Sequence, residues 1–368
     1  MEYVQEQVTT LHDLTGRIPD APTDRGAVVV PMTDREFESR TAERVLSALE
    51  TVSPNRVVVP LRAPHDAVGP MYDWLSAFDV PLSVLWCSSP RVEALLDDHG
   101  LTGPAGKGRD VWLALGVAAA DSEFVVCHDA DTKTYDSSVV PRLLAPLDRD
   151  FSFTKGYYAR VEENRFYGRL FRLFYAPLVR TLRRADDGRI LDYLAAFRYA
   201  LAGEFGMTAD LAAGMRVERD WGLEVGTLGG AFEHAGFDGS AQVDLGRYEH
   251  DHRGVAGPGG LSTMSEGVGS ALFRVCEAHG VTPEYETLPE RYRDTARRFV
   301  RQYAADAEFN RLDYDSAAER EQVETYADAV RPPDDHDRYA VLPAWDDTDI
   351  DPGEVLEAAR PMLSERRH

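Results

Sequence analysis

The chain has 368 residues, of which 43% are hydrophobic, enough to form one large core or two smaller ones. Its formal net charge of −23 excludes nucleic acid and anionic membranes as expected partners. No apolar run reaches the roughly 20 residues of a membrane helix, and residues 1–20 lack the pattern of a signal peptide. Cys87, Cys127 and Cys276 are far apart in sequence, which excludes a disulfide framework and a cysteine zinc site. We expect a cytoplasmic protein.

The basic residues are nearly all arginine. Only Lys107, Lys133 and Lys155 are lysines among 40 basic residues. An acidic surface almost without lysine favours a halophilic protein, because concentrated salt screens charge over a few ångströms. The alternative is a protein that is acidic without being adapted to salt. On the first interpretation, Lys107 and Lys155 are retained for function, whereas Lys133 is expected to be structural.

The first half of the chain alternates between predicted strands and helices. Residues 1–25 predict a helical or loose lead-in. β-Branched runs predict strands at residues 27–30, 56–60, 82–86 and 123–128. Apolar spacing predicts helices at residues 36–50, 75–78 and 108–120. The alternation indicates a parallel, Rossmann-like α/β sheet flanked by helices, which binds its ligand at the carboxyl ends of the strands.

The second half of the chain is predicted to be richer in helix. Strands are expected at residues 151–158 and 241–245, and helices at 166–183, 208–216, 221–236, 262–279 and 287–306. Residues 250–260 form a loop rich in Gly and His, and the acidic chain after residue 312 is expected to form a surface helix and loops. We divide the chain into a lead-in (1–25), a catalytic domain (26–260, with a donor half 26–150 and an acceptor half 151–260) and a helical acidic extension (261–368).

The sequence Asp129-Ala130-Asp131 directly follows the predicted strand 123–128. Two carboxylates at the carboxyl end of a strand can hold Mg²⁺ or Mn²⁺ together with a phosphorylated ligand. An Asp-x-Asp triplet also arises by chance in an acidic chain, so a solvated turn is the alternative. Its position after an apolar strand favours the metal site.

A second candidate, Gly106-Lys107-Gly108, lies at the start of the predicted helix 108–120. Lysine at a helix N-terminus can meet a phosphate, and the glycines allow close backbone approach. The spacing is not that of a Walker loop, and an ordinary flexible turn is the alternative.

Further short motifs follow in the second half of the chain. They are Lys155-Gly156-Tyr157-Tyr158, Gly168-Arg169, Ala202-Gly203-Glu204, Glu224-Val225-Gly226, Gln242-Val243-Asp244-Leu245-Gly246 and His250. Taken in this order over residues 26–280, the motifs resemble those of the glucosyl-3-phosphoglycerate synthases. These are retaining glycosyltransferases with a GT-A fold, related to the mannosyl-3-phosphoglycerate synthases.

The resemblance implies a role for each motif. Asp131 and His250 would hold a divalent cation, Mg²⁺ or Mn²⁺, with His252 as the alternative to His250. Asp131, Glu224 and Lys107 would be the catalytic residues. The donor would contact Pro31, Thr33, Lys107, Asp129, Ala130, Asp131, Gly203 and Glu204. The acceptor would contact Lys155, Gly156, Gly168, Arg169 and Glu224.

The chain departs from the pattern of that family in three places, of which the stretch between Val59 and Leu85 is one. Pro31-Met32-Thr33-Asp34-Arg35-Glu36 stands where the family has Pro-x-Leu-Asn-Glu-Glu, so the nucleobase of the donor stays open. Phe171 stands where the family has a threonine that helps to hold phosphoglycerate. Arg165, Arg169 and Arg172 are spaced to share one helical face, which could bind an acceptor phosphate or form salt bridges. The aromatic residues of the same segment are expected in the core.

We therefore expect a metal-dependent glycosyltransferase. It would move a hexose from a UDP-, GDP- or ADP-sugar to a small anionic acceptor, 3-phosphoglycerate, with retention, in the synthesis of a compatible solute. A homodimer is possible by the same resemblance. The alternatives are a sugar or lipid acceptor, a sugar-phosphate nucleotidyltransferase, and a non-catalytic sugar-nucleotide-binding protein. A nucleotidyltransferase would need a Gly-rich loop after the first strand, and Pro31-Met32-Thr33-Asp34 contains no glycine.

Overall fold

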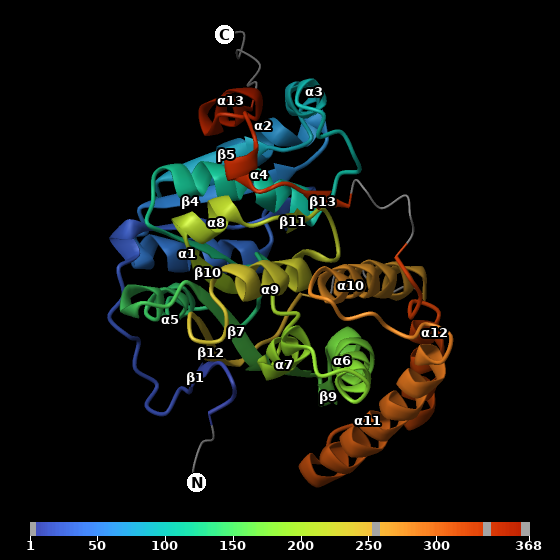
Figure 1. Ribbon diagram of the computed structural model, residues 1–368. Helices are drawn as coiled ribbons and strands as arrows, with labels where there is room; N and C mark the ends of the chain where they lie inside the picture. The colour runs from blue at the N-terminus through green and yellow to red at the C-terminus, as the bar shows by residue number, and fades with distance from the viewer. Residues whose placement is uncertain (1–4, 252–257, 334–339, 362–368) are drawn as a thin grey trace, which may run out of the picture.

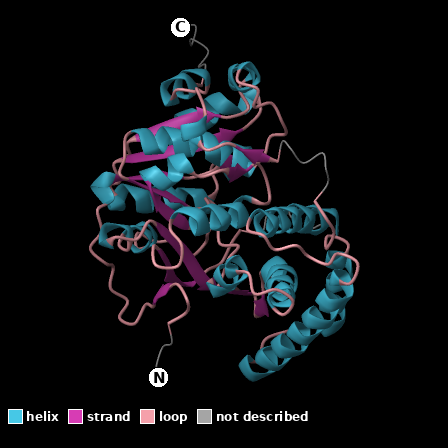
Figure 2. Cartoon of the chain, viewed as in Figure 1, coloured by secondary structure: helices cyan, strands magenta, loops and turns pink. Residues whose placement is uncertain are grey.

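The computed structural model describes residues 5–251, 258–333 and 340–361. A central sheet with the order β1-β12-β7-β10-β6-β2-β4-β3, and with β5 beside β4, crosses the molecule between layers of helices (Figures 1 and 2). Its strands are β1 (Thr9–Leu11), β2 (Gly26–Val29), β3 (Met32–Thr33), β4 (Arg56–Arg62), β5 (Leu82–Trp86), β6 (Phe124–Cys127), β7 (Phe153–Ala159), β10 (Phe205–Thr208) and β12 (Ser240–Arg247). Two small sheets pair β8 (Val161–Glu162) with β9 (Arg165–Phe166) and β11 (Val217–Glu218) with β13 (Val341–Leu342).

Helices connect most of these strands. They are α1 (Arg40–Val52), α2 (His65–Leu75), α3 (Pro90–Asp98), α4 (Lys107–Ala120), α5 (Val139–Leu144), α6 (Ala176–Arg183), α7 (Arg189–Ala196), α8 (Ala209–Gly214), α9 (Leu223–His234), α10 (Pro258–Ala278), α11 (Leu288–Asn310), α12 (Ser316–Ala327) and α13 (Pro352–Ala358). In the described ranges, no helix is both long and apolar enough to span a bilayer.

The alternation of side chains along the strands explains the layers. In β4, Val57 and Val59 join the hydrophobic cluster that contains the apolar residues of α1 and α2. Val58, between them, points to the opposite face and joins the cluster that contains those of α4. All three valines are fully buried, so β4 reads as a continuous apolar run, as expected for a strand covered on both faces.

The predicted strands at 27–30, 56–60, 82–86 and 123–128 are confirmed, and β2, β4, β5 and β6 pair in parallel as expected. The sheet is nevertheless mixed, because β10 runs antiparallel to both β6 and β7. The predicted lead-in is neither wholly helical nor wholly loose: Thr9–Leu11 is strand β1, parallel to β12 at the edge of the sheet. These short strands are defined by their pairing rather than by a local apolar pattern.

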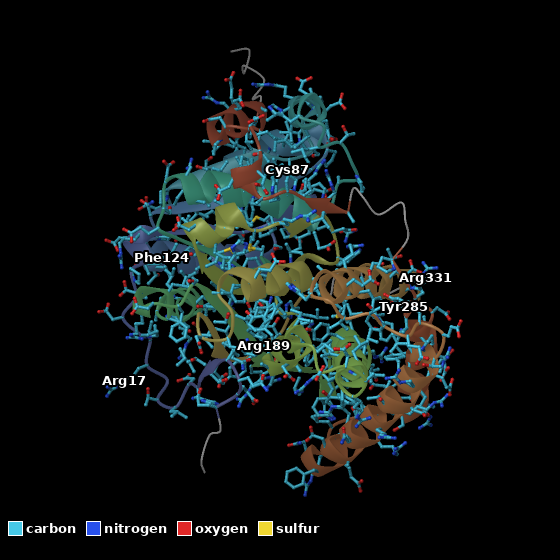
Figure 3. The ribbon with its side chains drawn as sticks, viewed as in Figure 1. Arg17, Cys87, Phe124, Arg189, Tyr285 and Arg331 are labelled. Carbon is cyan, nitrogen blue, oxygen red and sulfur yellow. The ribbon has the colours of Figure 1, made fainter. Side chains whose placement is uncertain are left out.

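Three helical predictions need correction. Residues 75–78 were expected in a helix, but α2 ends at Leu75 and residues 76–78 form a turn. The expected helix 166–183 begins instead as a π-helix at Leu170–Tyr175, which continues into α6. The acidic C-terminal part, expected at the surface, also contributes to the core: Tyr326 of α12 is fully buried, and Trp345 is 7% exposed. Trp345 stacks on Trp112 of α4 with ring centroids 4.5 Å apart. Charged side chains still radiate to solvent from α11 and α12 (Figure 3).

Candidate active site

The candidate site lies at the carboxyl edge of the central sheet. Asp129 and Asp131 follow β6 directly, and Ala130 between them also lines a cleft of about 980 Å³. Pro31 and Thr33, which follow β2, line the same cleft. Since β2 and β6 are parallel neighbours, the segments that follow them emerge side by side. The structure therefore brings the predicted donor residues of two strands together.

His250 reaches this site from the segment that follows β12. It forms an isolated antiparallel bridge with Thr132, and Asp251 N donates a hydrogen bond of 2.7 Å to Asp131 O. The backbone N of His250 also donates to Glu162 Oε1, at 3.2 Å. Backbone pairing thus places a residue more than a hundred positions away in sequence beside the carboxylates. The alternative ligand, His252, lies outside the described residues.

Asp129, Asp131 and His250 fit a divalent cation. One ligand atom from each lies within 4.8 Å of the others. Asp131 Oδ1 is buried and accepts no hydrogen bond from the described residues, as expected of an oxygen reserved for a ligand. Burial, followed by the negative charge of Asp129, raises the pKa of Asp131 to about 7. Carboxylate oxygens with an imidazole nitrogen suit Mg²⁺ or Mn²⁺.

Lys107 is the first residue of α4 and faces the same group of acids. Its Nζ lies 2.7 Å from Asp129 Oδ1 and 3.3 Å from Glu224 Oε1, in the first turn of α9. Burial opposes the charge of Lys107, but Asp129 and Glu224 outweigh it and raise the pKa of the lysine. Burial likewise opposes ionisation of Asp129, and the ammonium of Lys107 outweighs it, so the pKa of Asp129 is lowered. A paired cation therefore stands beside the metal triad.

The glycines on either side of Lys107 have a different role from the one expected. A Cβ added to Gly108 would lie 1.7 Å from the carbonyl oxygen of Glu218, and one added to Gly106 would lie 2.5 Å from that of Arg219. These glycines let the start of α4 pack closely against the backbone of Glu218 and Arg219. The close backbone approach predicted for a phosphate is made by the protein itself.

Gly203 and Glu204 form a wall beside Asp129. A Cβ on Gly203 would lie 2.6 Å from Asp129 Oδ2, so this carboxylate occupies the space that a side chain would need. Glu204 is fully buried, and its Oε1 accepts a hydrogen bond of 3.0 Å from Tyr248 Oη. Burial, followed by the charge of Asp129, raises the pKa of Glu204 to about 7. Tyr248 was not singled out from the sequence, although it follows a predicted strand.

Lys155 of β7 lies within the sheet rather than on its surface. Its side chain is fully buried, and no described residue accepts a hydrogen bond from Nζ, which lies 5.3 Å from the ring centroid of Phe205. Burial lowers the pKa of Lys155 to about 8, although Glu224 and Glu204 partly oppose the shift. Gly156 N donates to Glu204 O at 2.8 Å. The predicted acceptor residues Lys155 and Gly156 thus lie next to the wall of the site.

Gly168 and Arg169 form a tight turn before the π-helix. Gly168 has a φ of +72°, and a Cβ there would lie 2.6 Å from Tyr199 Oη, so both backbone and space require glycine. Arg169 is half-exposed, and its Nε lies 3.6 Å from Glu319 Oε1. Phe171 packs its ring against Tyr199, with centroids 4.8 Å apart. Phe171 therefore contributes an apolar contact where a threonine was expected to bind the acceptor.

A chain of aromatic rings connects this turn with the metal triad. The ring of Tyr199 lies 4.8 Å from that of Tyr158, which stacks on Tyr248 at 4.2 Å. Tyr248 in turn meets His250 edge-on, with centroids 5.2 Å apart. The turn at Gly168 and the three candidate metal ligands, Asp129, Asp131 and His250, are consequently connected by continuous aromatic packing.

The arginines around this turn do not share one face. Arg165 lies in strand β9, and Arg172 is buried in a two-pronged contact with Glu319, at 2.8 and 3.0 Å. The salt-bridge alternative is correct for Arg172, so among these arginines Arg169 stays as the acceptor candidate. Phe174 and Tyr175 of the same segment are buried, as expected for core aromatics, whereas Phe166, Tyr167 and Phe171 are only half-buried.

Other residues of the cleft were missed in the sequence. Arg62 ends β4, and its Nε lies 3.3 Å from Asp110 Oδ2. Trp86, which ends β5, and Trp221 also line the cleft. A signal was available for Arg62 and Trp86, because both lie at the carboxyl end of a predicted strand.

The sheet topology, with carboxylates at its carboxyl edge, is that of the GT-A fold, the fold class of many glycosyltransferases. The chain is 34% identical to the glucosyl-3-phosphoglycerate synthase of Methanococcoides burtonii, with 94% of this chain and 93% of the relative covered. It is 35% identical to that of Persephonella marina, covering 83% and 80%. The chain belongs to the glucosyl-3-phosphoglycerate synthase family and is a hexosyltransferase.

Solved structures support the fold. The glucosyl-3-phosphoglycerate synthase of Mycobacterium tuberculosis in complex with phosphoglyceric acid superimposes with a TM-score of 0.58 at 23% identity, covering 76% of this chain and 90% of the other. The same enzyme with Mn²⁺, UDP-glucose and phosphoglyceric acid gives 0.57 over 75% and 89%. No protein-family model matches the chain.

Proposed function

We propose that this enzyme transfers glucose from a nucleotide sugar to 3-phosphoglycerate with the help of Mg²⁺ or Mn²⁺. The observation that carries the proposal is the convergence of Asp129, Asp131 and His250 beside Lys107. Lys107 and the two aspartates also line one cleft. The name of the relatives described above, glucosyl-3-phosphoglycerate synthase, indicates 3-phosphoglycerate as the acceptor. A complex of the mycobacterial enzyme contains Mn²⁺, UDP-glucose and phosphoglyceric acid.

The donor half of the reaction rests on charge. Asp131 and His250 would hold the cation, with Asp129 within reach; when bound, it supplies positive charge against the diphosphate leaving group. Lys107 adds a fixed ammonium that Asp129 and Glu224 keep in place. Positive charge that is already oriented stabilises the departing diphosphate without reorganisation, which is usually the largest catalytic contribution.

The acceptor half needs local positive charge, because the chain carries −23 overall. The guanidinium of Arg169 can bind a phosphate through two parallel hydrogen bonds, and its side chain is 45% exposed. Phe171 and Tyr199, whose rings pack together beside this turn, would form the apolar side of the acceptor site. Lys155 would act through the electrostatic interaction of its charge with Glu204 and Glu224 rather than through contact with the acceptor.

For the chemical step we infer attack on the same face from which the diphosphate leaves. The acceptor hydroxyl oxygen bonds to the anomeric carbon, the bond from that carbon to the phosphate oxygen breaks, and the hydroxyl proton passes to the diphosphate. The carboxylate of Glu224 already pairs with Lys107, which favours a role in orienting the sugar and acceptor over one as a nucleophile.

The test measures product formation from UDP-, GDP- and ADP-glucose with 3-phosphoglycerate, with Mg²⁺, Mn²⁺ or EDTA in high salt. Asp131→Asn is expected to lower kcat at least a hundredfold and to weaken metal binding by calorimetry. Asp136→Asn is the control, because Asp136 is an exposed acid of the same loop that caps Ser138 N. Transfer to a neutral sugar or lipid but not to 3-phosphoglycerate would refute the acceptor. Wild-type turnover in EDTA would refute the metal site.

Other parts of the proposal rest on less specific observations. We infer a cytoplasmic location, since all three cysteines are buried and free, as is typical of reducing compartments. The division into a donor half, residues 26–150, and an acceptor half, residues 151–260, also stays a prediction. The homodimer and the adaptation to salt stay predictions.

A further inference from the structure

Glu319 is a buried carboxylate on α12, in the acidic C-terminal part of the chain. Its side chain is 5% exposed. Both oxygens accept hydrogen bonds from Arg172, at 2.8 and 3.0 Å, and Tyr314 Oη donates to Oε2 at 2.7 Å. This arrangement satisfies the carboxylate and fixes its orientation.

Among the residues that the structure describes, the same carboxylate is the only acid within 4 Å of the Arg169 guanidinium. Arg169 Nε lies 3.6 Å from Glu319 Oε1, and its side chain is 45% exposed. Within residues 5–251, 258–333 and 340–361, no residue accepts a hydrogen bond from the two Nη groups of Arg169. Glu319 thus forms an ion pair with the Nε edge of the guanidinium without accepting a hydrogen bond from it, and the two Nη groups stay available for a two-oxygen anion.

The C-terminal segment before α12 holds the other side of the acceptor turn. Asp313 N donates to Asn164 O at 2.8 Å, and Asn164 Nδ2 donates to Arg311 O at 3.3 Å. These contacts fix the β8–β9 hairpin, which carries Glu162, the acceptor of the hydrogen bond from His250 N. The chain from Arg311 to Glu319 therefore contacts both the β8–β9 hairpin before Gly168 and Arg169 after it.

We propose that Glu319 is a positioning residue that sets Arg169 for the anionic group of the acceptor, without contacting the acceptor itself. The proposal rests on the function given above, because it requires an anionic acceptor. Arg172 supplies the rigid frame: its buried two-pronged contact keeps the carboxylate from following Arg169 when that side chain moves. The C-terminal extension is in this way part of the acceptor site.

The experiment compares Glu319→Gln with a matched control on the same helix. Glu324→Gln is that control, because Glu324 also contacts two arginines, Arg293 at 2.9 Å and Arg297 at 3.0 Å, but lies at the surface, 48% exposed. Steady-state kinetics give kcat and the KM of donor and acceptor for each variant. Glu319→Gln is expected to raise the acceptor KM about tenfold, equal to about 1.4 kcal/mol, and to leave the donor KM within about twofold. Glu324→Gln is expected to change neither.

A double-mutant cycle separates positioning from a structural role. In an Arg169→Ala background, Glu319→Gln is expected to cause no further rise in the acceptor KM. An equal rise in both backgrounds, a parallel rise in the donor KM, or an unchanged acceptor KM would overturn the proposal.

A second variant covers the case in which Glu319→Gln does not fold. Glu319→Met with Arg172→Met removes the buried pair as a whole, which proteins often tolerate, and still deprives Arg169 of its anchor. The same selective rise in acceptor KM is expected. Wild-type enzyme that ignores 3-phosphoglycerate would refute the proposed function together with this inference. Normal use of 3-phosphoglycerate with an unaffected Glu319→Gln variant would refute the inference alone.

Discussion

Replacement of Lys155 by methionine should make the protein more stable and less active. The lysine is fully buried, and no described residue accepts a hydrogen bond from its Nζ. Burial lowers its pKa from the ordinary value of 10.5 to about 8. At neutral pH this difference corresponds to roughly 3 kcal/mol of lost folding stability, at about 1.36 kcal/mol for each tenfold change in proton affinity. Methionine keeps the length of the side chain without the charge.

The lowered pKa of Lys155 also predicts how the stability difference between wild type and variant changes with pH. Below pH 8 the folded and unfolded states both hold the proton of Lys155, so the whole cost is present in the wild type. Between pH 8 and 10.5 the folded state releases the proton first, and the wild type gains stability relative to the variant. The advantage of Lys155→Met should therefore shrink from about 3 kcal/mol at pH 7 to below about 1 kcal/mol at pH 10.

The assay is denaturant unfolding of wild type and variant at pH 7 and pH 10 in the same salt. Lys133→Met serves as the control, because Lys133 is exposed, and it should change stability by less than about 0.5 kcal/mol. Loss of stability at pH 7 in Lys155→Met, or a difference that does not change with pH, would refute the reasoning. Lower kcat in the stabilised variant would show that the buried charge serves the site at the expense of stability.

Three further substitutions test other parts of the structure. Gly203→Ala should lower kcat at least tenfold with little change in unfolding free energy, because its Cβ would displace Asp129; normal turnover would contradict this. Lys107→Arg should also lower kcat at least tenfold and raise the donor KM, because a larger, planar guanidinium does not fit the place of a compact ammonium between Asp129 and Glu224. Trp345→Ala should cost about 3 to 5 kcal/mol of unfolding free energy, measured by denaturation, since it removes the ring that stacks on Trp112.

The sequence predicted the part of the fold that local patterns control. Buried strands rich in valine, such as β2, β4 and β6, were evident because their apolar runs end in turn signals. β10 has four residues, one of them a glycine, and exists because β6 and β7 pair with it from both sides. Such a strand has no local pattern to detect.

The residues of the candidate site likewise fall into two groups: those that a local pattern locates and those that only the folded chain brings together. Asp129, Asp131 and Lys107 could be found because they occupy strand and helix ends that the pattern located. Glu162 and Glu319 could not, because their partners lie 88 and 147 residues away and only the folded chain brings them together. Arg165 was misplaced for a related reason: it pairs in strand β9 and does not belong to the helix that follows.

The stack of Trp345 on α4 also sets an order of events during synthesis. Trp345 Nε1 donates to Trp112 O at 2.7 Å, and Trp112 Nε1 donates to Pro343 O at 2.8 Å, so each indole is tied to the other's segment. A Cβ on Gly116 would lie 2.1 Å from the Trp345 ring, which shows how closely that ring covers the helix. The helix that begins with Lys107 therefore has an uncovered face while most of the chain is still being translated. The enzyme should acquire its finished active site only after Trp345 has left the ribosome.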